Sequence, residues 1–319
     1  MQRRLLLTSL ATPALAQNLW PDRPVRIVVP DAAGSGNDIT ARLFSQQLEL
    51  AFGQGFPVDN RAGAGGRIGV ESVFRAAPDG STLLLGNAGS NGINGALYRD
   101  LPYDLETDFT PLSLLVAGPN ALGINPRVLP VEDVAGLLAL LRARPPGRVN
   151  YASAGPGSSS HFSAELFQAM AGLRLTHIPY RGAAQMGQAV VSGDAPLVIG
   201  NLVNLQGFVT RGEIRLLAVT SLERWTATPE LPTLHESGLP GFETLAWNGL
   251  FGPPGLPAGV ASRLLPELRR AAALPELRSR IASIGGALVV SDGAALGARV
   301  RQDLAKWRAL AASAGIRPE

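Results

Sequence analysis

The sequence contains no cysteine and only three histidines among its 319 residues. Without cysteine there can be no disulfide, no thiolate metal site and no cysteine nucleophile. The histidines, His161, His177 and His235, do not stand at a spacing typical of metal ligands. We therefore expect neither a metal site nor a cofactor.

The chain also has little net charge. The chain has 28 basic and 25 acidic residues, and two of the basic residues, Arg3 and Arg4, stand at its start. Without these two, 26 basic residues face 25 acidic ones, so the rest of the chain is close to neutral. Because a nucleic-acid-binding protein needs an excess of positive charge to neutralise phosphates, we expect no nucleic-acid partner.

After the first residues, no segment approaches the roughly 18 apolar residues of a membrane-spanning helix. Residues 1–16 combine two arginines, an apolar run from Leu5 and small residues at Ala14 and Ala16. This pattern is typical of a secretory signal peptide cleaved near Ala16, by either the Sec or the twin-arginine route. We therefore expect export into a soluble compartment; the alternative is an N-terminal tail without this role.

The stretch Val149–Phe167 predicts an anion site. A short apolar strand, Val149–Ala152, is followed by small residues, Ser153–Ser160, and by an amphipathic helix that begins near His161. The first N–H groups of a helix lack partners within it, and its N-terminus carries a partial positive charge. An anion fits at such a helix end.

Two other strand ends predict further parts of the same site. Val25–Pro30 is a candidate strand, Asp31–Asp38 a loop of small residues and Ile39–Leu50 a candidate helix. Thr82–Gly86 is an apolar strand that ends in Asn87–Ser90. In α/β sheets, ligands bind beyond the carboxyl ends of the strands, so we expect these loops to meet.

The order of the elements predicts two α/β lobes. Strands and helices alternate along the chain, and the C-terminal third is mostly helical. Two apolar segments are expected to cross between the lobes. One is Leu112–Ile124, which is interrupted at Gly118 and Pro119, and the other is Leu245–Phe251. One lobe would comprise residues 17–118 and 245–319, and the other residues 119–244. Two crossings form a hinge, and hinged lobes close around ligands.

A glycine-rich loop, Asn60–Gly69, is the remaining candidate for a cofactor site. Its glycines follow the pattern G-x-G-x-x-x-G, after a poor strand and without a suitably placed acidic residue. This does not match the dinucleotide-binding pattern. We expect the loop to form a tight turn and close packing instead.

With these features the sequence resembles the substrate-binding proteins of tripartite tricarboxylate transporters, also called Bug or TctC-like proteins. The resemblance extends over nearly the whole chain after residue 16. It rests on nine motifs in order: GSGNDITARL (34–43), VDNRAGAGGRIG (58–69), APDGSTLLL (77–85), YDLETDFTP (103–111), YASAGPGSSSHFSAELF (151–167), HIPYRG (177–182), IRLLAVTSLERW (214–225), ELPTLHESGLPGFE (230–243) and WNGLFGPPGLP (247–257).

The resemblance implies a class II periplasmic binding protein fold, with two mixed, mostly parallel sheets, a hinge and an interlobe cleft. It implies a monomeric periplasmic receptor, not an enzyme, that binds a small carboxylate such as a di- or tricarboxylate or an aromatic acid. The partners would be the integral membrane subunits of a transporter. A sensor protein is an alternative partner that the sequence does not exclude.

Loop positions and resemblance together predict the ligand-binding residues. They are Ala33, Gly34, Ser35, Gly36, Asn37, Asn87, Ala88, Ala154, Gly155, Ser158, Ser159, Ser160, His161, Tyr180, Arg181 and Asn201. Arg181 is expected as a possible bidentate partner of a carboxylate or as a solvated surface residue. His161 is expected either to contact the ligand or to pack under its loop. Asp38 would repel a carboxylate, so we expect it to cap its helix or hold its own loop.

Several positions depart from the family pattern. Ser35 and Ala33 replace a usual glycine and proline, and Gln185–Met186 replaces Ala-Pro. Gly200 stands where an aspartate is frequent, which disfavours a ligand with a positively charged amine.

A rival hypothesis is an exported serine hydrolase that uses Ser158, Ser159 or Ser160 with His161. Adjacent helical side chains point apart, and the G-x-S-x-G nucleophile motif is absent around these serines. The sequence therefore favours a receptor without catalytic residues.

Overall fold

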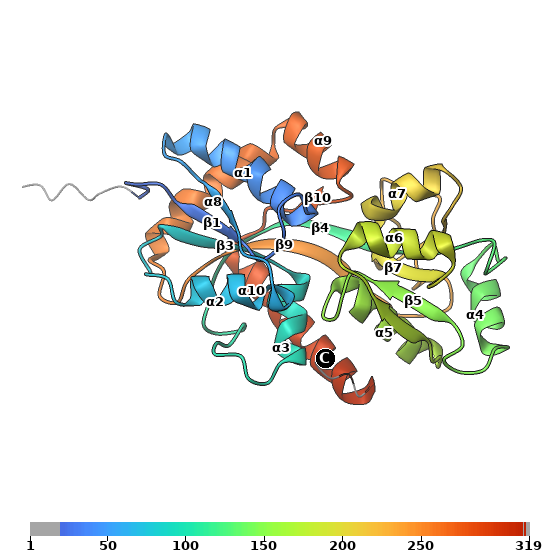
Figure 1. Ribbon diagram of the computed structural model, residues 1–319. Helices are drawn as coiled ribbons and strands as arrows, with labels where there is room; N and C mark the ends of the chain where they lie inside the picture. Colours follow the sequence, from blue (N-terminus) through green and yellow to red (C-terminus); the bar gives the residue numbers. More distant parts are fainter. Residues whose placement is uncertain (1–19, 315, 317–319) are drawn as a thin grey trace, which may run out of the picture.

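The computed structural model describes residues 20–314 and residue 316, which form two α/β lobes side by side (Figure 1). The expected signal peptide, residues 1–16, lies outside the described residues. The long strand β4 (Thr110–Ile124) and strand β9 (Leu245–Gly252) run between the lobes (Figure 1).

Each lobe consists of short strands and the helices that follow them. The other elements of the first lobe are β1 (Arg26–Val29), α1 (Gly36–Phe52), β2 (Val58–Asn60), the 3₁₀ turn η1 (Ala64–Gly66), α2 (Arg67–Phe74), β3 (Thr82–Asn87), the π-helical turn η2 (Gly89–Ile93), α3 (Asn94–Leu97), α8 (Ala258–Ala272), α9 (Pro275–Ser283), β10 (Ala287–Leu288) and α10 (Gly293–Ala314). Those of the second lobe are α4 (Val134–Arg142), β5 (Asn150–Ser153), α5 (Ser159–Ala171), β6 (Thr176–Pro179), α6 (Ala183–Ser192), β7 (Leu197–Asn201), α7 (Leu202–Thr210) and β8 (Arg215–Val219).

The mixed α/β fold agrees with the expectation, and its parallel pairs form the outer part of each sheet. In the first lobe β2, β1 and β3 are parallel, and in the second lobe β5 is parallel to β6 and β7. The crossing strands pair antiparallel: β3 with β9, and β4 with β7, β8, β9 and β10. The sheets are less parallel than expected because the crossing strands contribute these antiparallel pairs.

Strand β4 belongs to both sheets. It pairs with β9 from Thr110 to Pro119 and with β7 from Asn120 to Ile124. The expected interruption at Gly118 and Pro119 is wrong, because the strand continues through both residues. Proline can stand here since the ladder changes partners at this point, where a missing N–H donor is tolerated.

The apolar side chains form separate cores in the two lobes. Two buried clusters, around Phe44 and around Tyr103, use residues up to 117 and from 247 onward. Two others, around Tyr151 and around Met186, use only residues between 122 and 242. We therefore propose the lobe boundaries expected from the sequence, 17–118 with 245–319 and 119–244.

A buried polar network joins the crossing segments at the hinge. The Asn120 side chain donates to Ser163 Oγ at 3.0 Å, and Ser163 Oγ donates to Thr244 Oγ1 at 2.8 Å. Thr220 Oγ1 donates to the carbonyl oxygens of Thr244 at 2.6 Å and Asn120 at 3.0 Å. All four residues are buried, where polar groups need hydrogen-bond partners. The network therefore holds the two crossing segments together between the lobes.

The C-terminal region is mostly helical, as expected. Helix α8 accommodates Pro266 within its span, and Trp307 on α10 is buried in a core. The short strand β10, which pairs with β4, was not expected. In the part of the chain that the structure describes, no helix is both long and apolar enough to cross a membrane.

Candidate functional site

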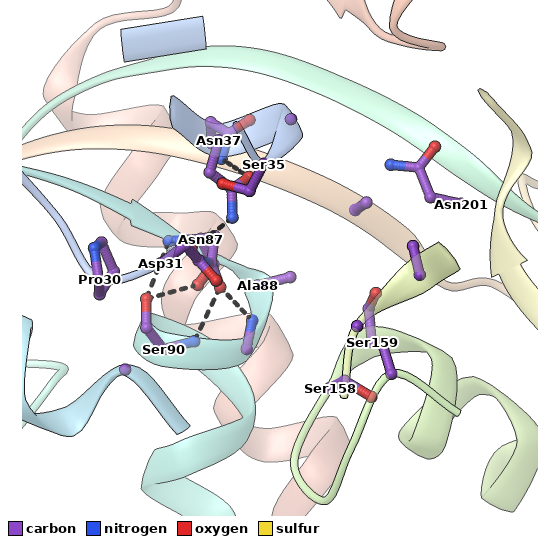
Figure 2. A pocket seen from close by; sticks show the side chains of 18 of the residues that line it. Pro30, Asp31, Ser35, Asn37, Asn87, Ala88, Ser90, Ser158, Ser159 and Asn201 are labelled. Atoms are coloured by element: carbon purple, nitrogen blue, oxygen red, sulfur yellow. Dashed lines mark hydrogen bonds between the residues drawn. The ribbon is translucent and has the colours of Figure 1, made fainter. Parts of the chain in front are cut away.

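A cleft of about 420 Å³ lies between the two lobes. The loops after β1 and β3 and the turn before α2 form one wall, and the loop after β5 with the starts of α6 and α7 forms the other. Figure 2 displays the two walls, with Ser35, Asn37, Asp31 and Asn87 on one side and Ser158, Ser159 and Asn201 on the other. The expected interlobe cleft is therefore present.

The loop after β1 is held by its own side chains. Ser35 caps helix α1, and its Oγ accepts a hydrogen bond from the Asp38 N–H at 3.2 Å. The Asp38 carboxylate in turn accepts from the Gly34 N–H at 2.8 Å and pairs with Arg42. Although burial opposes it, hydrogen bonds from Arg42 and Gly34 lower the pKa of Asp38. Asp38 thus holds its own loop, which was the expectation.

This capping leaves two donors at the start of α1. The N–H groups of Gly36 and Asn37 have no partner among the described residues, and both residues line the cleft. Free N–H groups at a helix N-terminus bind anions.

The loop after β5 has a matching construction. Ser158 caps α5 by accepting from the His161 N–H at 3.3 Å, and its Oγ donates to the Gly155 carbonyl at 2.6 Å. Ser160 is buried, and its Oγ accepts from the Ala154 N–H at 2.9 Å. Ser159 lines the cleft, and its N–H group has no partner in the described part of the chain. The loop therefore presents Ser159, while Ser158 and Ser160 shape it.

The second lobe contributes two more helix starts. Gly182 and Ala183 at the start of α6 line the cleft, and the Ala183 N–H lacks a partner within the described residues. Asn201, the last residue of β7, and Asn204, in the first turn of α7, also line it. With Gly66 before α2, five helix N-termini border one cleft. Their partial positive charges favour an anion.

The charged side chains of the cleft are unusual for an anion site. No lysine, arginine or histidine of the described chain lines it, and the one charged lining residue in that part is Asp31. An anion here must be held by backbone N–H groups, hydroxyls and amides, because no cationic side chain of the described residues lines the cleft. Of the described residues, no cluster of His, Asp or Glu could hold a metal ion.

Asp31 stands within a network of asparagines (Figure 2). Its Oδ2 accepts hydrogen bonds from Asn37 Nδ2 at 2.6 Å and Asn87 Nδ2 at 2.7 Å. Asn37 Oδ1 accepts from Asn248 Nδ2 at 2.6 Å. Burial raises the pKa of the Asp31 carboxyl, although the hydrogen bonds from Asn37 and Asn87 act against this.

Nine of the sixteen residues expected from the sequence line the cleft. They are Ser35, Gly36, Asn37, Asn87, Ala88, Ala154, Ser158, Ser159 and Asn201. The other seven do not line it: Ala33, Gly34, Gly155, Ser160, His161, Tyr180 and Arg181. Arg181 is exposed, and its backbone N–H donates to Gln185 Oε1, so it is placed as a surface residue. We restrict the proposed ligand contacts to the first group.

His161 packs under the loop, which was one of its two expected roles. Its ring stacks on that of His177, with centroids 4.1 Å apart, and its Nδ1 accepts from the Gly157 N–H at 3.3 Å. Burial, with the neighbouring His177 charge as a second cause, lowers the pKa of His161 to about 3. A neutral, buried imidazole that supports a binding loop is not a ligand contact.

Several lining residues were missed by the sequence analysis. Asp31 belongs to the predicted loop Asp31–Asp38 but was not among its predicted contacts, and Asn248 lies on the crossing strand β9, outside any predicted loop. Three glycines of the 60–69 loop, Gly63, Gly65 and Gly66, also line the cleft at positive φ. That loop does form the expected close packing: a Cβ on Gly69 would lie 2.9 Å from Pro30 Cα. Its glycine content could have indicated the approach to the site.

Comparisons with known proteins identify the family. The family model described as "Tripartite tricarboxylate transporter family receptor" matches residues 40–316. The "UPF0065 protein in tcbD-tcbE intergenic region" of Pseudomonas sp. (strain P51) is 36% identical over 282 residues, which cover 88% of this chain and 83% of that protein.

Solved structures give the same result. "R. palustris Rpa4515 with adipate" matches with a TM-score of 0.84 and 35% identity, covering 94% of this chain and 100% of that chain. "MatC (Rpa3494) from Rhodopseudomonas palustris with bound malate" matches with a TM-score of 0.81 and 31% identity, covering 91% of this chain and 99% of that chain.

The two lobes, the hinge and the cleft define a periplasmic solute-binding protein. Within this class, the chain belongs to the tripartite tricarboxylate transporter receptors, the family that includes the Bug proteins. The proteins of this family are receptors, so the chain is not an enzyme.

Proposed function

We propose that the cleft binds a small organic carboxylate and that the receptor delivers it to the membrane subunits of a tripartite tricarboxylate-type transporter. The observation that carries this proposal is the convergence of five helix N-termini on a cleft without a cationic side chain among the described residues. Backbone N–H groups in this arrangement bind a carboxylate and release it without breaking a strong ion pair.

The proposed clamp has two jaws. Gly36 and Asn37 line the cleft from the first lobe and Ser159 and Ala183 from the second, and the N–H groups of these residues have no partner among the described residues. A ligand that bridges the jaws stabilises the closed form, because only that form provides both sets of donors.

Helix dipoles alone are too weak for this binding. Each helix end typically contributes about 0.3–1 kcal/mol to an anion, so five of them contribute at most about 5 kcal/mol, whereas micromolar affinity requires about 8 kcal/mol. Direct hydrogen bonds and the removal of water on closure must supply much of the difference. Specificity therefore depends on the side chains of the cleft walls.

The choice of candidate ligands follows from the relatives. Two structural relatives are described with adipate and with malate, which are both dicarboxylates. A binding panel should therefore contain mono-, di- and tricarboxylates of several lengths, together with aromatic acids.

A thermal-shift experiment tests the proposal. The protein is purified from a periplasmic extract, its N-terminus, expected at Gln17, is determined by mass spectrometry, and it is unfolded and refolded to remove carried-over ligand. We expect at least one carboxylate to raise the melting temperature, since a ligand that binds only the folded state stabilises it by mass action. Calorimetry then gives the affinity. If no carboxylate in the panel produces a shift, the proposal fails.

Delivery is tested separately by co-purification of the ligand-bound receptor with membrane proteins. We expect transporter subunits. Recovery of a sensor kinase in their place would assign the same binding function to signalling.

A further inference from the structure

The amide nitrogens of two asparagines are directed toward Asp31, and the orientation of Asn87 is determined by its other partners. Asn87 Oδ1 accepts hydrogen bonds from the backbone N–H groups of Gly89 at 2.8 Å and Ser90 at 2.9 Å. Its amide nitrogen must therefore face Asp31. The Asn37 amide nitrogen also points to Asp31, while its Oδ1 accepts from Asn248 Nδ2. The network thus directs donors toward one carboxylate.

These donors use only part of the capacity of Asp31. An ionised carboxylate offers about four acceptor sites, and the two amides share Oδ2. No lysine, arginine or histidine of the described residues forms an ion pair with Asp31. The side chain borders the cleft and is partly exposed to it. Asp31 Oδ1 accepts no hydrogen bond from the described residues, so on closure of the cleft it would lose hydration without gaining a partner.

We propose that Asp31 selects the ligand by accepting a hydrogen bond from a hydroxyl or ammonium group of the ligand, whose carboxylate is held at the helix N-termini. This inference rests on the proposed function of the same cleft. It defines the ligand as a hydroxy- or amino-carboxylate, with the donor group directed toward the first lobe.

The charge of Asp31 argues against a second carboxylate at this position. Two carboxylates in contact repel each other, and one of them must take up a proton to bind. A hydroxyl or ammonium group instead supplies the donor that Oδ1 lacks among the described residues. Asp31 also provides an acidic group in the cleft, so the glycine at position 200 does not exclude an amine on the ligand.

The simpler interpretation is that Asp31 only positions Asn37 and Asn87. The two interpretations predict different effects of the Asp31 charge on the affinities of the ligands. A positioning role predicts that loss of the charge weakens all ligands equally, whereas a contact predicts a change in their order of affinity.

Calorimetry with two matched ligand series tests the inference. The four-carbon series is succinate, malate and aspartate, which share a skeleton and differ in carrying no donor, a hydroxyl or an ammonium group. The six-carbon series is adipate, 2-hydroxyadipate and 2-aminoadipate. In at least one series we expect a donor-bearing ligand to bind about tenfold to a hundredfold more tightly than the plain dicarboxylate, as for a hydrogen bond to a charged group. The better of the two donor ligands identifies the group.

The variant Asp31→Asn tests the residue. Its amide oxygen can accept from Asn37 and Asn87, which places its NH₂ group where the wild-type protein has an acceptor. We expect the preference for the donor-bearing ligand to be lost: an ammonium group, which cannot accept a hydrogen bond, then binds less tightly than the plain dicarboxylate, and a hydroxyl, which can accept one, binds about as tightly. Asp22→Asn makes the same chemical change at an exposed position of the first lobe outside the cleft, and should keep the wild-type order.

Each remaining outcome has a defined meaning. If dicarboxylates and their donor-bearing analogues bind equally, or if Asp31→Asn weakens all of them by the same factor, the inference is wrong and the proposed function stands. If no ligand of either series and no carboxylate of the wider panel binds, the proposed function fails and the inference with it. Circular dichroism of Asp31→Asn shows whether the variant is folded, and so separates a loss of binding from a loss of folding.

Discussion

At the scale of single residues, burial favours the neutral form of two groups on opposite sides of the cleft. Burial raises the pKa of Asp31 in the first lobe and lowers that of His161 in the second lobe to about 3. The two effects on stability have opposite signs. The contribution of Asp31 to the free energy of unfolding decreases as the pH rises above the ordinary pKa of its carboxyl. The contribution of His161 decreases as the pH falls below the ordinary pKa of its imidazole.

The His161 effect gives a pH prediction. Its ordinary pKa is about 6.5, so the unfolded chain takes up a proton as the pH falls below that value, while the folded protein does not until about pH 3. The contribution of His161 to the free energy of unfolding therefore decreases as the pH falls from 6.5 toward 3. Replacing His161 by Gln removes this contribution. We expect the variant to lose less stability than the wild type between pH 7 and pH 4.

Urea unfolding at several pH values measures this effect. The comparison uses the slope of unfolding free energy against pH, so any constant destabilisation by the substitution cancels. Equal slopes for the wild type and His161→Gln would show that the imidazole is protonated in the folded state, against the packing role assigned to it.

At the scale of elements, the two serines at the start of α5 have different functions. Ser158 caps the helix and donates to Gly155, whereas Ser159 lines the cleft and its N–H group has no partner among the described residues. The sequence presents them as equivalent members of a triple serine. Only the backbone conformation separates the cap from the residue that follows it.

We therefore expect Ser158→Ala and Ser159→Ala to differ. Loss of the cap lowers the free energy of unfolding by about 1 kcal/mol, and binding weakens because the loop is less well held. Ser159→Ala leaves stability within about 0.5 kcal/mol and weakens binding only through its hydroxyl. Urea unfolding and calorimetry on both variants provide the comparison. Equal stability losses would contradict the assignment of Ser158 as the cap.

The sequence predicted the elements around the site because their patterns are local. The apolar run Thr82–Gly86 and the small residues after Val25–Pro30 and Val149–Ala152 each contain their own signal. Helices α1 and α5 begin two or three residues earlier than expected, at Gly36 and Ser159, because glycine and serine favour the cap and first turn without marking the boundary.

Features that depend on distant contacts were not predictable in this way. The continuity of β4 through Pro119 depends on a change of partner strand, and β10 exists because it pairs with β4. Asn248 reaches the cleft only through the register of β9 with β3 and β4. A single sequence carries no pattern for such pairings.

At the scale of the whole molecule, a small apolar core connects the lobes behind the cleft. Phe162 on α5 packs edge to face on Trp307 on α10, with ring centroids 5.6 Å apart. Ile93, Leu97 and Leu310 complete this core, so one helix of the second lobe rests on the C-terminal helix of the first. The start of α5 that carries Ser159 is therefore positioned partly by α10, near the junction in Figure 1.

The interlobe core predicts a link between packing and affinity. Trp307→Leu should lower the free energy of unfolding by about 2–5 kcal/mol and, because α5 loses its support, should also weaken carboxylate binding about threefold to tenfold. Trp307→Phe keeps a ring against Phe162 and removes an indole N–H that has no hydrogen-bond partner in the described chain. We expect its affinity to be close to that of the wild type.

Phe44→Leu is the matched control, because Phe44 is buried in the first lobe alone. It should reduce stability without changing the affinity of the remaining folded protein, since no contact of the second lobe depends on it. Calorimetry at a temperature where all variants are folded separates the two effects. If Phe44→Leu and Trp307→Leu weaken binding equally, affinity follows general stability, and the contact of α5 with α10 does not position the binding loop.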